Sequence, residues 1–309
     1  MNGFLKQLAE KHSVDLIGVC SLKLLEEQKK HFSELRREDT AFGSTEPVQR
    51  LEYKRAWEKA EGIISFGLSY KNIIPEPSDM SERLRVSMYA YGKDYHRVLK
   101  ERAEVLMADF TLKYACSFRI FSDSGLLYDR TAAYCAGLGF IGKNRFLINE
   151  HFGSFIFLGH ILTDIELTSE VQPAENKCSG CRQCTDSCPH RASDGEFLDY
   201  RKCISYMTQK GICEGFDTSG YIYGCDICQF SCPFNEDAPQ TGHKEFLENA
   251  DADYAYPSFA DIMALKPDGG KYKDSAMMWR GSDILKKNAL AVKMLRDEKR
   301  LSADSGKQK

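Results

Sequence analysis

The sequence predicts a mixed α/β domain, then a cysteine-rich segment, then a C-terminal helical segment. Helix-like and strand-like periodicities alternate over residues 1–170. Nine of the twelve cysteines lie between positions 178 and 232, and an amphipathic helical pattern returns over 283–300. We therefore divide the chain into 1–170, 171–240 and 241–309.

The first segment contains the alternating elements. Apolar periodicity predicts helices over 2–12, 22–37, 94–114 and 128–139, and strands over 14–20, 62–70, 117–123 and 154–165. Residues 168–177 are polar and read as a linker. After the helix at 283–300 we expect a disordered polar tail.

Composition excludes some classes of protein. The net charge is −3 with 28% charged residues, so a nucleic-acid partner would have to contact a local basic patch. The N-terminus lacks the apolar core of a signal peptide, and no stretch is long and apolar enough to span a membrane. We expect a cytoplasmic protein, in which closely spaced cysteines bind metal more often than they form disulfides.

The cysteine spacing predicts iron–sulfur clusters. The run "CSGCRQCTDSCP" at 178–189 has the C-x2-C-x2-C-x3-C-P pattern of bacterial ferredoxins, in which the fourth cysteine binds a second cluster. The run "CDICQFSCP" at 225–233 supplies three more cysteines and the proline. One predicted cluster therefore takes Cys178, Cys181, Cys184 and Cys232, and the other Cys188, Cys203, Cys225 and Cys228. Cys213 is the alternative to Cys203, and a zinc ribbon is the alternative to iron–sulfur.

The run "GLGFIG" at 137–142 has the G-x-G-x-x-G spacing of the dinucleotide-binding fingerprint, but its sequence context differs. That fingerprint follows a strand and opens a helix, whereas here a helical pattern precedes it and an apolar "FLI" follows. We expect these glycines to allow close approach of the backbone to a flat or bulky group.

Several segments together resemble the epoxyqueuosine reductase family. They are the two cysteine runs, "RKCISYMT", "YAYGKDYH" at 89–96, residues 121–144, "GSFIFLGHILTDI" at 153–165 and "WRGSDILKKNALAVKML" at 279–295. The resemblance implies a two-electron, two-proton reduction of the epoxide of epoxyqueuosine, at the wobble base of tRNA, to the alkene. It also implies cobalamin, a fold like that of reductive dehalogenases, and a ferredoxin-like domain with two [4Fe-4S] clusters. Many members carry a C-terminal helical-repeat extension for tRNA, and this sequence stops at Lys309 without one, which bears on the extent of tRNA contact more than on the chemistry.

The resemblance also implies site residues. Asp123 in "FSDSG" is the expected general acid, with partial burial raising its pKa; on the residues alone it would more often cap the following helix. Asp129 is the second candidate, although its place next to Arg130 favours a local ion pair between the two. The expected cobalamin contacts are Val86, Tyr89, Asp123, Gly125, Gly142, Lys143, Asn144, Ser154 and Ser205. Tyr91 and His96 are further candidates, although Tyr and His are commonly structural. His160 is not assigned to cobalt, because the family is expected to bind cobalamin without a protein histidine.

The expected partners are tRNA and an external electron donor such as a flavodoxin or ferredoxin, with the protein as a monomer away from membranes. The C-terminal helix could dock the anticodon arm through Lys286, Lys287, Lys293, Arg296, Lys299 and Arg300. A solvated helix face is the alternative interpretation. Rival functions are a dehalogenase-like corrinoid reductase of a small substrate and a simple electron-transfer module.

Overall fold

The computed structural model describes residues 1–34, 52–123, 127–169, 171–172, 174–195 and 197–306. The chain forms two compact units that each combine distant segments. Unit 1 contains Met1–Lys71, His96–Asp199 and Ile227–His243, and unit 2 contains Asn72–Tyr95, Tyr200–Asp226 and Lys244–Lys309. The division into 1–170, 171–240 and 241–309 made from the sequence stays a prediction.

Unit 1 is built on a four-stranded antiparallel sheet. Its strands are β1 (Leu16–Val19), β2 (Gly62–Ser69), β7 (Ile156–Thr163) and β4 (Phe118–Phe121), in the order β1-β2-β7-β4. Every residue of β2 is buried, which explains its nearly continuous apolar run. Phe66 on β2 lies opposite Gly159 on β7, where an added Cβ would come within 2.3 Å of the Phe66 ring.

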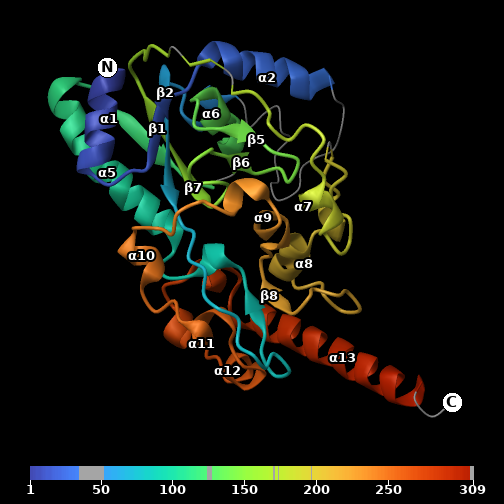
Figure 1. The fold of residues 1–309 in the computed structure, drawn as a ribbon. Coiled ribbons are helices and arrows are strands. Elements are labelled where there is room, and N and C mark those ends of the chain that lie inside the picture. Colours follow the sequence, from blue (N-terminus) through green and yellow to red (C-terminus); the bar gives the residue numbers. More distant parts are fainter. Residues whose placement is uncertain (35–51, 124–126, 170, 173, 196, 307–309) are drawn as a thin grey trace. The chain divides into compact units, whose positions relative to one another are not determined.

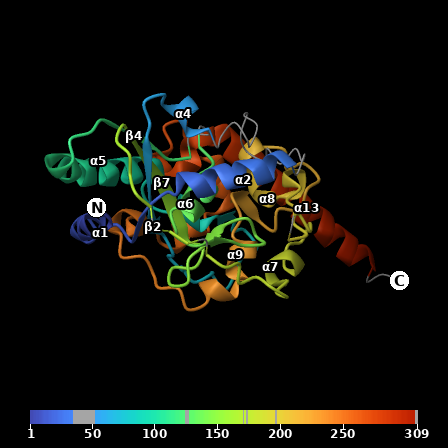
Figure 2. The same cartoon turned by 90° about the horizontal axis from the view of Figure 1, so that it is seen from above.

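Helices cover both faces of this sheet (Figures 1 and 2). Helices α1 (Asn2–Lys11) and α5 (Tyr95–Lys113) lie on one face, where the rings of Phe4 and Phe110 are 6.4 Å apart. Helices α2 (Leu22–Glu34) and α6 (Asp129–Cys135) lie on the other face. The short helix α4 (Tyr53–Ala56) precedes β2 in the chain. The mixed α/β fold is confirmed, and each strand and helix expected here is present within a few residues. Residues 35–37 of the helix expected over 22–37 lie outside the described residues.

The "GLGFIG" segment leads into a small hairpin. Strand β5 (Phe140–Ile141) pairs with β6 (Leu147–Ile148), so no helix follows the glycines, as expected. An added Cβ at Gly139 would lie 2.2 Å from the carbonyl oxygen of Ile148. The close approach at Gly139 is therefore to the chain's own backbone.

The remaining elements of unit 1 are short. Helices α7 (Gln183–Asp186) and α9 (Ile227–Phe230) and the 3-10 turn η3 (Pro233–Asn235) belong to the two cysteine runs.

Unit 2 contains one short parallel strand pair and several helices. Strand β3 (Arg85–Val86) pairs with β8 (Tyr221–Tyr223). The helical elements are η1 (Met88–Ala90), η2 (Tyr200–Lys202), α8 (Ile204–Lys210), α10 (Lys244–Leu247), α11 (Ala252–Ala255), α12 (Phe259–Met263), η4 (Gly270–Tyr272), η5 (Ala276–Arg280) and α13 (Ser282–Gly306).

Helix α13 is held to its unit by a buried asparagine. The Asn288 amide donates to the carbonyls of Thr208 and Ile222, at 2.7 and 2.9 Å. The expectation of a disordered tail after residue 300 is wrong for 301–306, which continue the helix, and 307–309 lie outside the described residues. The polar composition suggested disorder, but the backbone hydrogen bonds of the helix continue past the amphipathic stretch.

Candidate functional site

Four cysteines from the two runs share one location in unit 1. Cys178 and Cys232 are buried in the same apolar cluster as Phe140 and Ile148. Burial raises the pKa of the Cys232 thiol, and the neighbouring Cys178, Cys184 and Cys181 raise it further. Burial also raises the pKa of Cys184, as do Cys178 and Cys181.

Such a group of thiols suits an iron–sulfur cluster. Thiolates that raise one another's pKa are costly unless a cation compensates their charge, and cluster iron would supply that compensation. The neighbours that raise the pKa of Cys232 are the three partners that the spacing predicts, Cys178, Cys181 and Cys184. Within the described residues no three ligand side chains are arranged around a common metal position, so the assignment of these four cysteines to one cluster stays a prediction.

Residues of the β5–β6 hairpin lie next to this group. The Lys143 ammonium donates to the carbonyl of Cys181 at 2.8 Å. The Asn144 side-chain oxygen accepts from the Phe146 N–H at 3.2 Å, but its buried Nδ2 has no hydrogen-bond partner among the described residues. An added Cβ at Gly142 would lie 2.9 Å from Asn144 Oδ1, so the glycine makes room for the amide. A buried, unpartnered amide is a natural donor to a bound group.

Ser154 takes part in a buried network beside Cys232. Its hydroxyl contacts the amide nitrogens of Gln229 and Asn235 at 3.0 and 2.9 Å. Asn235 Oδ1 accepts from the Ser154 N–H at 2.6 Å. Because both amides flank Cys232 in the chain, Ser154 helps to position the segment that carries this cysteine.

Lys71 holds the same segment, and the sequence analysis missed it. The side chain is 8% exposed, and its ammonium donates to the carbonyls of Asn235, Glu236 and Ala238 at 2.8, 3.1 and 2.5 Å. Burial lowers the pKa of Lys71. Only its place directly after a buried strand, unusual for a lysine, could have drawn attention to it.

The second set of cysteines remains a prediction from spacing. Cys188 Sγ accepts from the Ala192 N–H at 3.4 Å, Cys203 precedes α8, and Cys228 lies in α9. The alternative ligand Cys213 is 2% exposed, and burial raises the pKa of its thiol to about 11, although Lys287 opposes that rise.

Val86 and Tyr89 lie together near the end of the first strand of unit 2. Val86 is buried on β3, and the Tyr89 ring packs 5.7 Å from the ring of Tyr223. An added Cβ at Gly224 would lie 2.6 Å from the Tyr89 ring, so the glycine permits this packing. Ser205 lies on α8, where its hydroxyl accepts from the Gln209 amide at 3.3 Å.

A buried carboxyl that the sequence analysis did not identify fixes this region of unit 2. Asp226 accepts from the Ser87 hydroxyl at 2.5 Å and from the Met88 N–H at 2.7 Å. Burial raises its pKa to about 6, although both hydrogen bonds oppose that rise. The carboxyl positions the turn that carries Tyr89.

Asp123 follows β4 in a strained conformation. Its φ is +44°, its side chain is 65% exposed, and Oδ2 lies 3.9 Å from Nε2 of His96. The expected partial burial is therefore not observed. Asp123 does not cap the next helix either, because the N-cap of α6 is Tyr128. Gly125 lies outside the described residues.

Asp129 lies beside a histidine. Its carboxylate is 3.3 Å from Nε2 of His160, and Nδ1 of this fully buried histidine bonds the Ser65 hydroxyl at 2.9 Å. Arg130, its expected partner, donates to the carbonyl of Arg145. The sequence pattern could not show this, because His160 comes from β7.

The basic residues of α13 make separate contacts. The Lys293 ammonium lies 4.5 Å from the centre of the Phe259 ring. Lys299 pairs with Asp217 at 2.6 Å, and Arg296 donates to the Ser81 carbonyl at 3.1 Å. Lys287 is exposed and Lys286 is half-buried.

No described helix is both long and apolar enough to cross a bilayer.

Two family models match the chain. The model described as epoxyqueuosine reductase QueG, DUF1730, matches residues 50–124, and the 4Fe-4S double cluster binding domain matches 177–235. The second match favours iron–sulfur over the zinc alternative. An epoxyqueuosine reductase of Lactococcus garvieae is 36% identical over 256 residues, which cover 78% of this chain and 71% of the relative.

Solved structures agree with these matches. A crystal structure of epoxyqueuosine reductase with a tRNA-Tyr epoxyqueuosine-modified stem loop has a TM-score of 0.80 and 27% identity, covering 94% of this chain and 80% of that one. The Bacillus subtilis enzyme, with its catalytic loop swung out of the active site, has a TM-score of 0.77 and 27% identity, covering 94% and 81%. By sequence and by fold, this chain belongs to the epoxyqueuosine reductase family.

Proposed function

We propose that the protein reduces the epoxide of epoxyqueuosine, at the wobble position of tRNA, to the alkene of queuosine. The reaction consumes two electrons and two protons and releases the epoxide oxygen as water. The observation that carries the proposal is the gathering of Cys178, Cys181, Cys184 and Cys232 in a chain of this family.

Two [4Fe-4S] clusters would deliver the electrons one at a time. The first would be held by the four gathered thiols, and the second by Cys188, Cys203, Cys225 and Cys228. The Lys143 ammonium beside the Cys181 carbonyl would favour the reduced, more negative state of the first cluster. An external flavodoxin or ferredoxin would supply the electrons.

Cobalamin would be the second cofactor, and the residues present suit it. Its corrin ring carries amide side chains, which need partners of the kind offered by the buried Asn144 Nδ2. When bound, cobalamin supplies reduced cobalt, a strong nucleophile toward strained carbon. The proposed contacts are Gly142, Lys143, Asn144, Val86, Tyr89 and Ser205. Ser154 is assigned to positioning the Cys232 segment.

Asp123 would protonate the oxygen that leaves the opened epoxide. The Bacillus subtilis relative has been seen with its catalytic loop outside the active site. The exposed Asp123, at positive φ beyond β4, suits a similar outward arrangement. Moving the carboxyl out of water would raise its pKa, so that it would carry a proton near neutral pH.

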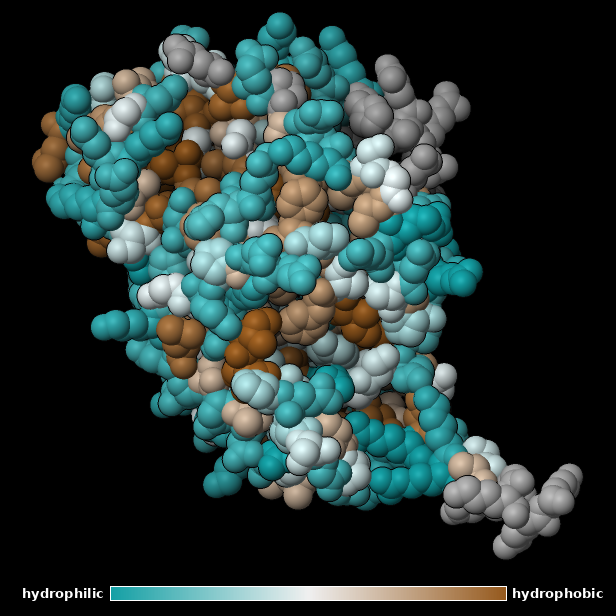
Figure 3. Space-filling model, viewed as in Figure 1, coloured by the Kyte–Doolittle hydropathy of each residue, from teal (hydrophilic) through white to brown (hydrophobic). Residues whose placement is uncertain are grey.

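The tRNA would be held partly by α13, whose visible side is largely hydrophilic in Figure 3. Lys286 and Lys287 are the proposed docking residues. We further propose that the protein acts as a monomer in the cytoplasm.

The test is anaerobic turnover. The protein, reconstituted with iron and sulfide, is incubated with a strong reductant, cobalamin and tRNA that carries epoxyqueuosine, and the nucleosides are analysed by mass. We expect queuosine to appear, and a visible spectrum with both iron–sulfur and retained corrinoid absorption. A protein that keeps corrinoid and clusters but leaves the epoxide intact would favour a dehalogenase-like reductase, and one that retains no corrinoid would favour an electron-transfer module.

A further inference from the structure

A pocket of about 240 Å³ lies between the loop 217–220 and α13 in unit 2. Water takes up about 30 Å³ per molecule, so the pocket can accept a group the size of phosphate together with several waters. Its walls are Asp217, Thr218, Ser219, Gly220, Val292, Leu295, Arg296 and Lys299. None of these residues belongs to the proposed cluster or cobalamin contacts.

The loop is a tight, internally bonded turn. The Tyr221 N–H donates to the Thr218 carbonyl at 3.0 Å, and Ser219 and Gly220 have φ of +54° and +86°. The Asp217 carboxylate accepts from the Ser219 N–H at 2.8 Å. An added Cβ at Gly220 would lie 3.2 Å from the Arg296 guanidinium, so glycine keeps the loop close to this cation.

Thr218 is one of the residues that line the pocket, and its hydroxyl is covered and has no partner within the described chain. The residue is 2% exposed, and its Oγ1 is buried with no hydrogen-bond partner among the described residues. Buried hydroxyls are normally bonded, so this hydroxyl would gain a partner if the Thr218 side chain turned it toward a ligand in the pocket.

Cations gather on the same side. Arg296 donates to the Ser81 carbonyl at 3.1 Å, and within the described chain no carboxylate lies at ion-pairing distance from its guanidinium. Burial lowers the pKa of Arg296; Glu82 opposes this, and the nearby Arg300 and Arg85 add to it. A guanidinium held among other cations gains from an anion.

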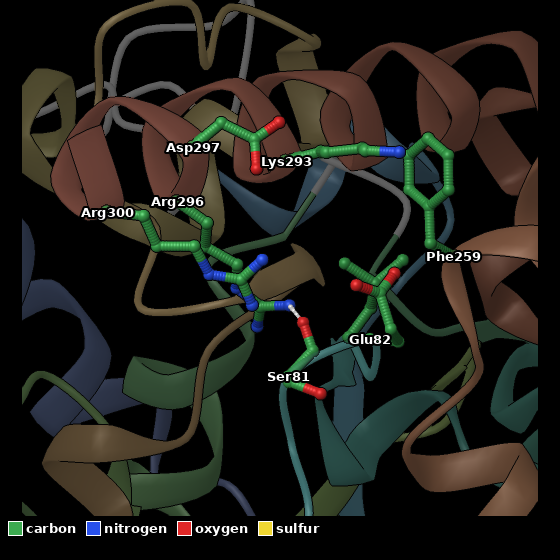
Figure 4. Close-up of a pocket in the computed structure, with 8 residues that line it drawn as sticks. Ser81, Glu82, Phe259, Lys293, Arg296, Asp297 and Arg300 are labelled. Carbon is green, nitrogen blue, oxygen red and sulfur yellow. Dashed lines mark hydrogen bonds between the residues drawn. The ribbon is translucent and has the colours of Figure 1, made fainter. Parts of the chain in front are cut away.

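Figure 4 shows the other side of Arg296, at a small hollow of about 20 Å³, large enough for about one water. There Arg296 and Arg300 both reach toward Ser81, whereas Lys293 points to the Phe259 ring. The larger pocket is therefore the one with room for a ligand.

We propose that this pocket binds a phosphate group, with Arg296, Lys299 and the Thr218 hydroxyl as donors. A planar guanidinium, an ammonium and a hydroxyl suit the several oxygens of phosphate. Lys299 would be shared between Asp217 and the anion. We assign the phosphate to the RNA backbone of the tRNA substrate. This assignment rests on the proposed function.

The test uses reconstituted holoprotein and an RNA anticodon stem loop, with affinity measured over a range of salt concentrations. Arg296→Gln should weaken binding roughly tenfold at low salt and reduce the slope of log affinity against log salt by about one, as for the loss of one phosphate contact. Thr218→Val should weaken binding a few-fold with the slope unchanged, and Thr218→Ser should restore it. Lys266→Gln removes an exposed charge from the same unit and is the matched control.

The alternatives give different results. If Thr218→Val raises the Tm and leaves RNA affinity unchanged, the hydroxyl is only a structural feature and the proposal is wrong. If inorganic phosphate stabilises wild type but not Arg296→Gln, and RNA binding is equal in the two, the pocket binds free phosphate and the RNA assignment is wrong. If wild type leaves the epoxide intact while Arg296→Gln still weakens RNA binding, the proposed reaction fails and the phosphate site stands.

Discussion

The buried ammonium of Lys71 donates to the carbonyl of Asn235 at 2.8 Å, three residues beyond the proposed ligand Cys232. The same ammonium bonds the carbonyls of Glu236 and Ala238. A single cation thus fixes the backbone that follows Cys232.

Lys71→Met should therefore loosen the first cluster. It leaves buried carbonyls unpaired at a cost of about 1–3 kcal/mol each, so we expect a lower Tm and faster loss of the iron–sulfur absorption in air. Lys54→Met is the control, because Lys54 forms an exposed ion pair with Glu61, which contributes little to stability. Equal cluster lifetimes in the two variants would show that Lys71 does not hold the ligand segment.

Cys203→Ala and Cys213→Ala separate the two candidates for the second cluster. The anaerobically reconstituted wild type should contain about eight irons and eight sulfides. Cys203→Ala should lose about half of the iron, whereas Cys213→Ala should keep nearly all of it, because only burial and Lys287, and no neighbouring cysteine, shift the pKa of the Cys213 thiol. Iron and acid-labile sulfide assays measure both. The reverse pattern would move the ligand to Cys213, and zinc without sulfide would exclude the clusters.

Asp123→Asn should slow turnover while the clusters and bound cobalamin remain. The amide is nearly isosteric but cannot give up a proton, and a positioned general acid is typically worth about a hundredfold to ten-thousandfold in rate. Single-turnover conversion of the modified tRNA measures the effect, and absorption spectra check the cofactors. Asp129→Asn is the matched comparison; if it alone is inactive, the donor is Asp129.

Asp15 should make stability depend on pH. Burial tends to raise the pKa of Asp15, but hydrogen bonds from His243 at 2.8 Å and from the Ser69 N–H at 2.6 Å lower it overall. A lowered folded-state pKa contributes stability above the unfolded-state value near 3.8, and this contribution is lost as the pH falls through the folded-state pKa.

Asp15→Asn should therefore cost about 1 kcal/mol of unfolding free energy at neutral pH, a figure that allows for partial exposure of the carboxylate. The difference from wild type should shrink below about pH 4. Urea unfolding at several pH values measures it. A difference that does not change between pH 7 and pH 3 would show that the carboxylate charge contributes nothing.

The sequence by itself determined the elements whose signal is local. The apolar run of β2 and the periodicity of α5 identified a strand and a helix, because burial repeats with the geometry of each element. The cysteine spacing likewise predicted one ligand set, because cluster geometry dictates short, fixed intervals. Three of its members, Cys178, Cys181 and Cys184, are near enough to raise the pKa of the fourth, Cys232.

Only the tertiary structure decided which distant groups meet. It brought Lys71 to the Asn235 carbonyl, placed Asp129 beside His160 and buried Asp226 against Ser87. It also left Asp123 exposed and opened a pocket between the 217–220 loop and α13. The physical reason is that periodicity reports which side of an element is buried, whereas hydrogen bonds and pockets depend on how elements far apart in the chain pack together.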